Sequence, residues 1–167
     1  MYKRQGRVGL LATPATVASG AYGRAVGAAA PDVELISVAC PDLAPIIQSG
    51  FPFDQRVVDT VHSYCEPLRD AGVDTVILGC THYPLVGPML QRALGRSIVL
   101  VTSGAAVAGR VEVALEERDL ESRSEGEGDY RFLCTGDVEA FRTLGTRFLQ
   151  MPLGDVAHVE LPAQVPA

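Results

Sequence analysis

The sequence lacks a long apolar run, a paired cysteine motif and a basic stretch, and each absence argues against a class of protein. No run of apolar residues approaches the roughly 20 that a membrane-spanning helix needs. The opening residues, MYKRQGR, are positively charged, but no apolar segment with a cleavage site follows them, so a secretory signal is not expected. We therefore expect a cytoplasmic protein without membrane contacts.

Cysteine is scarce, and its spacing argues against a structural metal site. The four cysteines are Cys40, Cys65, Cys80 and Cys134, and no two of them form a CxxC pair or a zinc-binding pattern. In a reducing compartment they are free thiols. Each is therefore either a small core residue or a participant in chemistry.

The acidic net charge of −6 is concentrated in one polar segment. Residues 116–129 hold seven acidic residues and two arginines, and the remainder of the chain is close to neutral. The part of this segment from 118 to 129 cannot bury enough apolar surface to order itself. Without a basic face for phosphates, we expect no binding to nucleic acid.

The remaining sequence alternates strands with helices, which predicts an α/β fold with a parallel sheet flanked by helices. We expect a long loop over residues 40–53, and a helix that begins after Asp54 and ends at Gly72. Beyond residue 117, a strand, a helix at 138–149 and a last strand make too small a core to stand alone. The other expected strands are 7–12, 32–39, 73–78 and 97–101, and the other helices are 15–29, 84–94 and 102–117.

The segment TVILGCTHYP, residues 75–84, carries the strongest functional signal. A buried cysteine at a strand end is most often a small apolar residue, but Cys80 is followed by Thr81 and His82. Thr81 is expected to cap a helix from Pro84, whose N-terminus favours a thiolate. An imidazole two residues from the thiol can carry a proton or orient a group.

The segment ATPAT, residues 12–16, offers a second site at the same edge of the sheet. Thr13 caps a helix that Pro14 begins, and this is an ordinary N-terminus. Alternatively, Thr13 and Thr16 form a seat for a carboxylate. Other groups are expected to have no catalytic role: His62 is solvated, His158 is structural, Cys65 and Cys134 lie in the core, and Cys40 has no basic neighbour.

Five segments together resemble the C-terminal part of the glutamate racemases, cofactor-independent members of the aspartate/glutamate racemase family. GCTHYP is the most specific motif, and the resemblance spans residues 7–161. The segments are LLATPATVASGAY, CPDLAPIIQSG, TVILGCTHYPLV, VLVTSGAAVAGRV and YRFLCTGDVEAFRTLGTRFL.

The resemblance implies two pseudo-symmetric α/β lobes around a cleft, without pyridoxal phosphate or metal. Each lobe supplies one cysteine: one thiolate removes the α-proton of glutamate, and the other thiol returns a proton to the opposite face. By position, Cys80 is the second-lobe base acting on L-glutamate and His82 assists it, while Thr81, Thr13 and Thr16 bind substrate. The resemblance also implies a role in supplying D-glutamate for peptidoglycan. A complete protein of this family is expected to form a homodimer.

The chain departs from the family pattern in two respects. Gln48 stands where the family usually has glutamate, and the family's D-S-G, P-Y-G and C-N-T motifs of the first lobe do not occur. We therefore expect a fragment that is inactive alone. In this interpretation residues 1–6 are a non-native leader, 7–101 form the second lobe, and 102–167 would complete the first lobe.

Three alternatives remain open at the level of sequence. Aspartate or another acidic amino acid could be the substrate in place of glutamate. Cys80 and His82 could act as nucleophile and base in acyl transfer. The chain could instead be a non-catalytic binding module that pairs through an exposed apolar surface.

Overall fold

The computed structural model describes residues 6–50, 54–122, 126 and 128–162 of the chain. These fall into two compact units, Met1–Glu121 and Ser122–Ala167. Of the expected leader, residues 1–6, only Gly6 is among the described residues. In the described part of the chain, every helix is too short or too polar to cross a bilayer.

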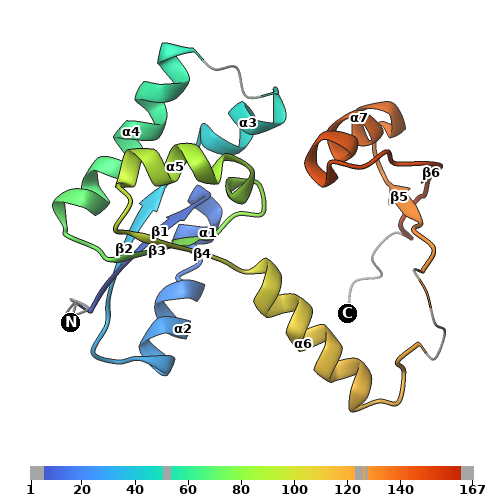
Figure 1. Cartoon of the computed structure of the whole chain (residues 1–167), viewed down its shortest axis with the longest axis horizontal. Helices are drawn as coiled ribbons and strands as arrows, with labels where there is room; N and C mark the ends of the chain where they lie inside the picture. Colours follow the sequence, from blue (N-terminus) through green and yellow to red (C-terminus); the bar gives the residue numbers. More distant parts are fainter. Residues whose placement is uncertain (1–5, 51–53, 123–125, 127, 163–167) are drawn as a thin grey trace. The chain divides into compact units, whose positions relative to one another are not determined.

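A four-stranded, fully parallel sheet forms the centre of the first unit (Figure 1). The strand order is β2-β1-β3-β4, and the predicted α/β fold class is confirmed. Each strand begins at the predicted position or two residues after it. The strands are β1 (Arg7–Ala12), β2 (Glu34–Ala39), β3 (Thr75–Leu78) and β4 (Val99–Thr102).

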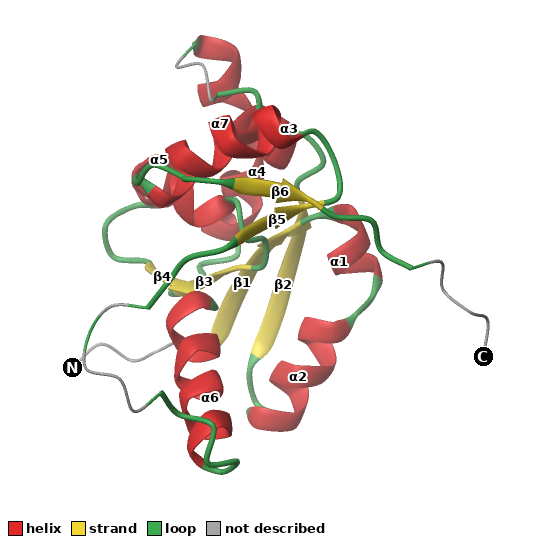
Figure 2. Cartoon of the chain, turned by 90° about the vertical axis from the view of Figure 1, so that its right-hand side faces the viewer, coloured by secondary structure: helices red, strands yellow, loops and turns green. Residues whose placement is uncertain are grey.

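Helices cover the two faces of this sheet unequally. The pair α4 and α5 lies on one face and α2 lies on the other (Figures 1 and 2). Helix α4 alone buries four apolar side chains, whereas α1, α2 and α6 have no buried residue. The core of the unit therefore lies between the sheet and α4 with α5. The helices are α1 (Pro14–Ala18), α2 (Ala21–Ala29), α3 (Leu43–Gln48), α4 (Gln55–Asp70), the 3₁₀ turn η1 (Tyr83–Val86), α5 (Gly87–Leu94) and α6 (Gly104–Glu116).

Helix α4 begins and ends as its sequence predicts. The Asp54 Oδ1 atom accepts a hydrogen bond of 2.9 Å from the Val57 amide and satisfies one free donor of the first turn. Gly72, with a φ of 67°, follows the last turn in a left-handed conformation that costs glycine little.

Three expected elements differ in the structure. The helix expected over 15–29 is interrupted at Gly20, whose φ of 63° is left-handed. The loop expected over 40–53 contains α3, because Leu43 and Ile47, one turn apart, are both buried. The helix expected from Pro84 begins as η1 and becomes an α-helix at Gly87, where Pro88 occupies its first turn.

The second unit contains a single strand–helix–strand motif. Its elements are β5 (Phe132–Cys134), α7 (Val138–Leu149) and β6 (Val156–His158), and the two strands pair in parallel. Among its described residues only Leu153 and Val156 are buried. Such a core is small, as expected, and the assignment of residues 102–167 to another lobe stays a prediction.

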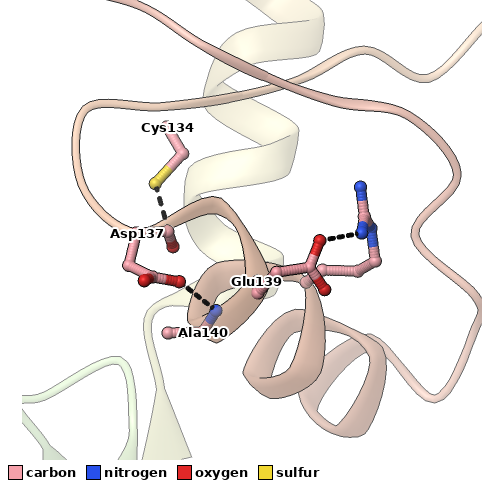
Figure 3. A network of polar contacts seen from close by, with 5 residues as sticks. Cys134, Asp137, Glu139 and Ala140 are labelled. Carbon is pink, nitrogen blue, oxygen red and sulfur yellow. Dashed lines mark hydrogen bonds and ion pairs between the residues drawn. The ribbon is translucent and has the colours of Figure 1, made fainter.

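Cys134 lies at a polar turn of the second unit, not in a core as we expected (Figure 3). Its side chain is half-exposed. The Gly136 amide donates to Cys134 Sγ over 3.3 Å, and the thiol in turn lies 3.8 Å from the Asp137 carbonyl oxygen. The Asp137 carboxylate caps α7 through the Ala140 amide at 2.7 Å. The thiol therefore belongs to the turn that starts this helix.

Candidate functional site

The strand order places a topological switch point at the carboxyl ends of β1 and β3. The chain leaves β1 for β2 on one side and leaves β3 for β4 on the other, so its direction reverses between these two central strands. The connecting helices accordingly lie on opposite faces: α2 on one face and α5 on the other (Figure 1). Ligands of open parallel sheets bind at such a switch point.

Thr13 and Cys80 emerge at this switch point at the same level. Leu11 of β1 pairs with Leu78 of β3, and Thr13 and Cys80 each come two positions after one of these paired residues. The Gly79 amide continues the ladder with a 2.8 Å bond to the Leu11 carbonyl. A Cβ on Gly79 would lie 2.8 Å from Leu10 Cδ1, so only glycine allows this close approach.

Cys80 and His82, two residues apart in sequence, are in contact. The Cys80 Sγ atom lies 3.7 Å from His82 Nδ1, and both side chains are half-buried. The Thr81 hydroxyl oxygen lies 3.5 Å from the same ring nitrogen, so it faces the pair from the exposed side. A thiol, an imidazole and a hydroxyl thus meet around one atom, His82 Nδ1.

The expectation that Thr81 caps a helix is wrong. The element that follows is the four-residue η1, its cap position is His82, and no side chain caps it. A single 3₁₀ turn aligns few peptide dipoles, so it favours a thiolate at Cys80 less than a regular helix would. The nearest polar partner that the structure gives this sulfur is the His82 ring.

Thr13 and Thr16 form a joined pair at the start of α1. Thr13 accepts a 3.3 Å hydrogen bond from the Thr16 amide, which confirms its predicted capping role. The two hydroxyl oxygens are 2.9 Å apart, and either can donate to the other. One of the two hydroxyl protons therefore remains available for a ligand.

A glutamine that sequence analysis noted only as a departure from the family lies against the same histidine. Gln48 ends α3, and its Nε2 atom is 3.1 Å from His82 Nε2. The two residues are 34 positions apart, and the loop expected in place of α3 gave no reason to bring them together. Cys80, His82 and Gln48 therefore form a continuous chain of contacts.

Tyr83, which the sequence analysis did not discuss, is a buried residue that directly follows His82. It is fully buried, and its hydroxyl donates to the Cys40 carbonyl over 3.2 Å. The loops that follow β2 and β3 are thereby tied together. Burial raises the pKa of the Tyr83 hydroxyl, which keeps it a donor.

Several further polar residues are exposed on other elements. Thr102 and Ser103 are exposed at the end of β4, at the same edge of the sheet. His62 is exposed on α4, as predicted, and His158 is exposed on β6. Among the residues that the structure describes, no group of three or more His, Cys, Asp or Glu is arranged to hold a metal ion.

Comparison with known proteins decides the family. The family model described as Asp/Glu/Hydantoin racemase matches residues 1–111. The chain belongs to the Asp/Glu/Hydantoin racemase family. Two curated relatives are glutamate racemases, from Beutenbergia cavernae at 40% identity and from Mycobacterium leprae at 42%. These matches cover 98% and 97% of the chain but 59% and 60% of the relatives. The chain thus spans about three fifths of their length.

Solved racemase structures share the fold. The glutamate racemase isoform RacE1 from Bacillus anthracis superposes with a TM-score of 0.87 at 28% identity, over 96% of the chain and 60% of that protein. The glutamate racemase from Francisella tularensis, solved in complex with D-glutamate, gives 0.85 at 28% identity, over 93% and 58%. The predicted resemblance to the racemases is confirmed.

Native thiol labelling is expected to separate the four cysteines into two pairs. Burial raises the pKa of Cys40 to about 12 and that of Cys65 to about 11, so both groups stay almost entirely in the unreactive thiol form at pH 8. Cys80 and Cys134 are half-exposed. Brief iodoacetamide treatment followed by peptide mass spectrometry should therefore label these two, and label Cys40 and Cys65 only after unfolding. Equal labelling of all four in the folded chain would contradict the buried assignment.

Proposed function

We propose that this chain carries one half of a glutamate racemase site, with Cys80 as the acid/base on one face of the substrate. The observation that supports it most is the contact of Cys80 with His82 at the switch point of the sheet, in a chain whose relatives are glutamate racemases. As a thiolate, Cys80 takes the α-proton of L-glutamate and becomes a thiol, leaving a carbanion. A second acid then delivers a proton to the opposite face.

None of the other three cysteines of this chain is suited to be the second acid/base. Stereo-inversion needs an acid and a base on opposite sides of one carbon. Cys40 and Cys65 are buried with raised pKa values, and Cys134 belongs to the turn before α7. We propose that a further lobe supplies it, and that residues 102–167 belong to that lobe while 7–101 form the lobe of Cys80. The chain alone is then inactive.

The three threonines are suited to hold the substrate around the reacting carbon. Thr13 and Thr16 present joined hydroxyls at the same level as Cys80, and Thr81 is exposed beside His82. Donors fixed in place stabilise the charge that builds on the α-carboxylate when the proton leaves. No cofactor enters this scheme. In a cell the product would serve peptidoglycan synthesis in the cytoplasm, and the complete protein would be a homodimer.

Complementation with the unmatched part of a relative tests the proposal. We would fuse this chain to the N-terminal part of the Mycobacterium leprae protein that lies outside the match, and incubate the fusion with L-glutamate in heavy water. Deuterium at Cα and D-glutamate in the product are the expected results, and the chain alone should give neither. Aspartate under the same conditions tests the choice of substrate.

A matched control is the same fusion with the corresponding C-terminal part of the Beutenbergia cavernae protein. If that fusion exchanges Cα and the fusion with this chain folds but does not, the proposed activity is wrong. Faster exchange on aspartate than on glutamate would keep the racemase mechanism and correct the substrate.

A further inference from the structure

We propose that Gln48 is a positioning residue that fixes the His82 ring as the neutral tautomer with its proton on Nδ1, directed at Cys80. The observation is a chain of two contacts: Gln48 Nε2 to His82 Nε2 at 3.1 Å, and His82 Nδ1 to Cys80 Sγ at 3.7 Å. The role of the thiol rests on the proposed function, but the tautomer does not.

The assignment follows from which atoms of Gln48 and His82 can donate a hydrogen bond and which can only accept one. The Gln48 amide nitrogen can only donate, so the ring nitrogen that faces it must accept and carries no proton. A neutral imidazole has one N–H, which then lies on Nδ1. That N–H lies within reach of the Cys80 sulfur at 3.7 Å and of the Thr81 hydroxyl oxygen at 3.5 Å, and it can donate to a thiolate without the ring becoming charged.

The position of Gln48 is held by the packing of its helix. Leu43 and Ile47, on the same helix α3, are 0% and 3% exposed, so the helix is fixed to the core up to the residue before the glutamine. Gly50 follows two positions later in a left-handed conformation, with a φ of 104°. The amide is therefore presented to the ring by a rigid element although its own side chain is exposed.

A glutamate at position 48 would impose the opposite arrangement. A carboxylate can only accept, so it requires a proton on His82 Nε2. The neutral ring would then offer a bare Nδ1 to Cys80, and only a charged imidazolium could donate to the thiolate. The amide thus lets a neutral histidine support the thiolate, which an acidic residue at this place does not allow.

The competing arrangement places the ring proton on Nε2, donated to a reversed Gln48 amide. His82 Nδ1 would then accept a hydrogen bond from the Cys80 thiol or from the Thr81 hydroxyl, whose oxygen is 3.5 Å away. The two arrangements differ in which ring nitrogen is protonated, and that difference is directly measurable.

Long-range proton–nitrogen correlation spectra of the ¹⁵N-histidine-labelled chain test the assignment under alkaline conditions, where imidazoles are neutral. Only three histidines are present, and His82→Asn identifies the signal. The expected spectrum has a protonated Nδ1 and a bare Nε2. Gln48→Glu should reverse the two nitrogens or give a doubly protonated ring, and Gln48→Leu should move the ring towards the Nε2–H form that free histidine prefers.

Gln55→Leu is the matched control, because Gln55 is an exposed glutamine that pairs with Asp59 on α4. It should leave the His82 signal unchanged. Severalfold slower alkylation of Cys80 in Gln48→Leu is a second expected readout. A wild-type ring protonated on Nε2, or a ring unaffected by Gln48→Leu in a folded chain, would overturn the assignment. Neither outcome depends on glutamate turnover, so failure here is distinct from failure of the racemase proposal.

Discussion

Replacing Cys80 with serine is expected to reduce Cα deuterium exchange on L-glutamate by about a thousandfold in the fusion with the Mycobacterium leprae segment. A serine hydroxyl is far less acidic than a thiol and does not form an anion near neutral pH. Oxygen occupies less space than sulfur, so the half-buried position and the contact with His82 should tolerate the change. The measurement is the initial rate of deuterium incorporation, read by proton NMR of glutamate.

The matched control for this substitution is Cys134→Ser. Cys134 is half-exposed, like Cys80, but its side chain belongs to the turn before α7. It should lower the exchange rate little. If Cys80→Ser retains the full rate while the fusion is folded, the thiol is not the base and the proposed function fails.

The largest effect on stability is expected from Leu68→Ala, at about 2–5 kcal/mol of unfolding free energy. Leu68 is 0% exposed, on the face of α4 that covers the sheet. Its methyl groups lie against Gly9: a Cβ built on this glycine would be 2.9 Å from Leu68 Cδ1 and 3.1 Å from Val76 Cγ2. Gly9→Ala alone should therefore cost about 1–3 kcal/mol by overpacking.

The double variant should be less destabilised than the sum of the two changes, by about 0.5–3 kcal/mol, because the new methyl group on residue 9 occupies space that the shortened residue 68 leaves. Urea unfolding of the three variants and the wild type measures this coupling. Val107→Ala on α6, 56% exposed, is the control and should change stability by about 0.5 kcal/mol at most. Strictly additive values would show that residues 9 and 68 do not share the contact.

Much of the fold could be predicted because its signals are local. The four strands of the sheet are apolar runs, and Asp54 and Gly72 mark the ends of α4. Since the strands alternate with helices, the carboxyl edge of the sheet follows, and with it the common location of Thr13 and Cys80.

What could not be predicted depends on packing between distant segments. Helix α3 has only six residues and contains a proline, so its sequence predicts a helix only weakly. The helix is stabilised by the burial of Leu43 and Ile47. The contact of Gln48 with His82 then follows from where α3 packs, since it joins residues 34 positions apart. The helix expected at Pro84 is interrupted because Gly87 and Pro88 begin a new one, which is why Thr81 has no helix to cap.

The buried tyrosine beneath the site has a consequence for how a substrate enters. Because Tyr83 holds the carbonyl of Cys40, the segments after β2 and β3 cannot open independently without losing that hydrogen bond and exposing a large aromatic ring to water. Slow amide exchange throughout both segments is the corollary. In the proposed racemase, this side of the site would form a fixed wall, and a substrate would enter and leave through movement of other parts of the protein.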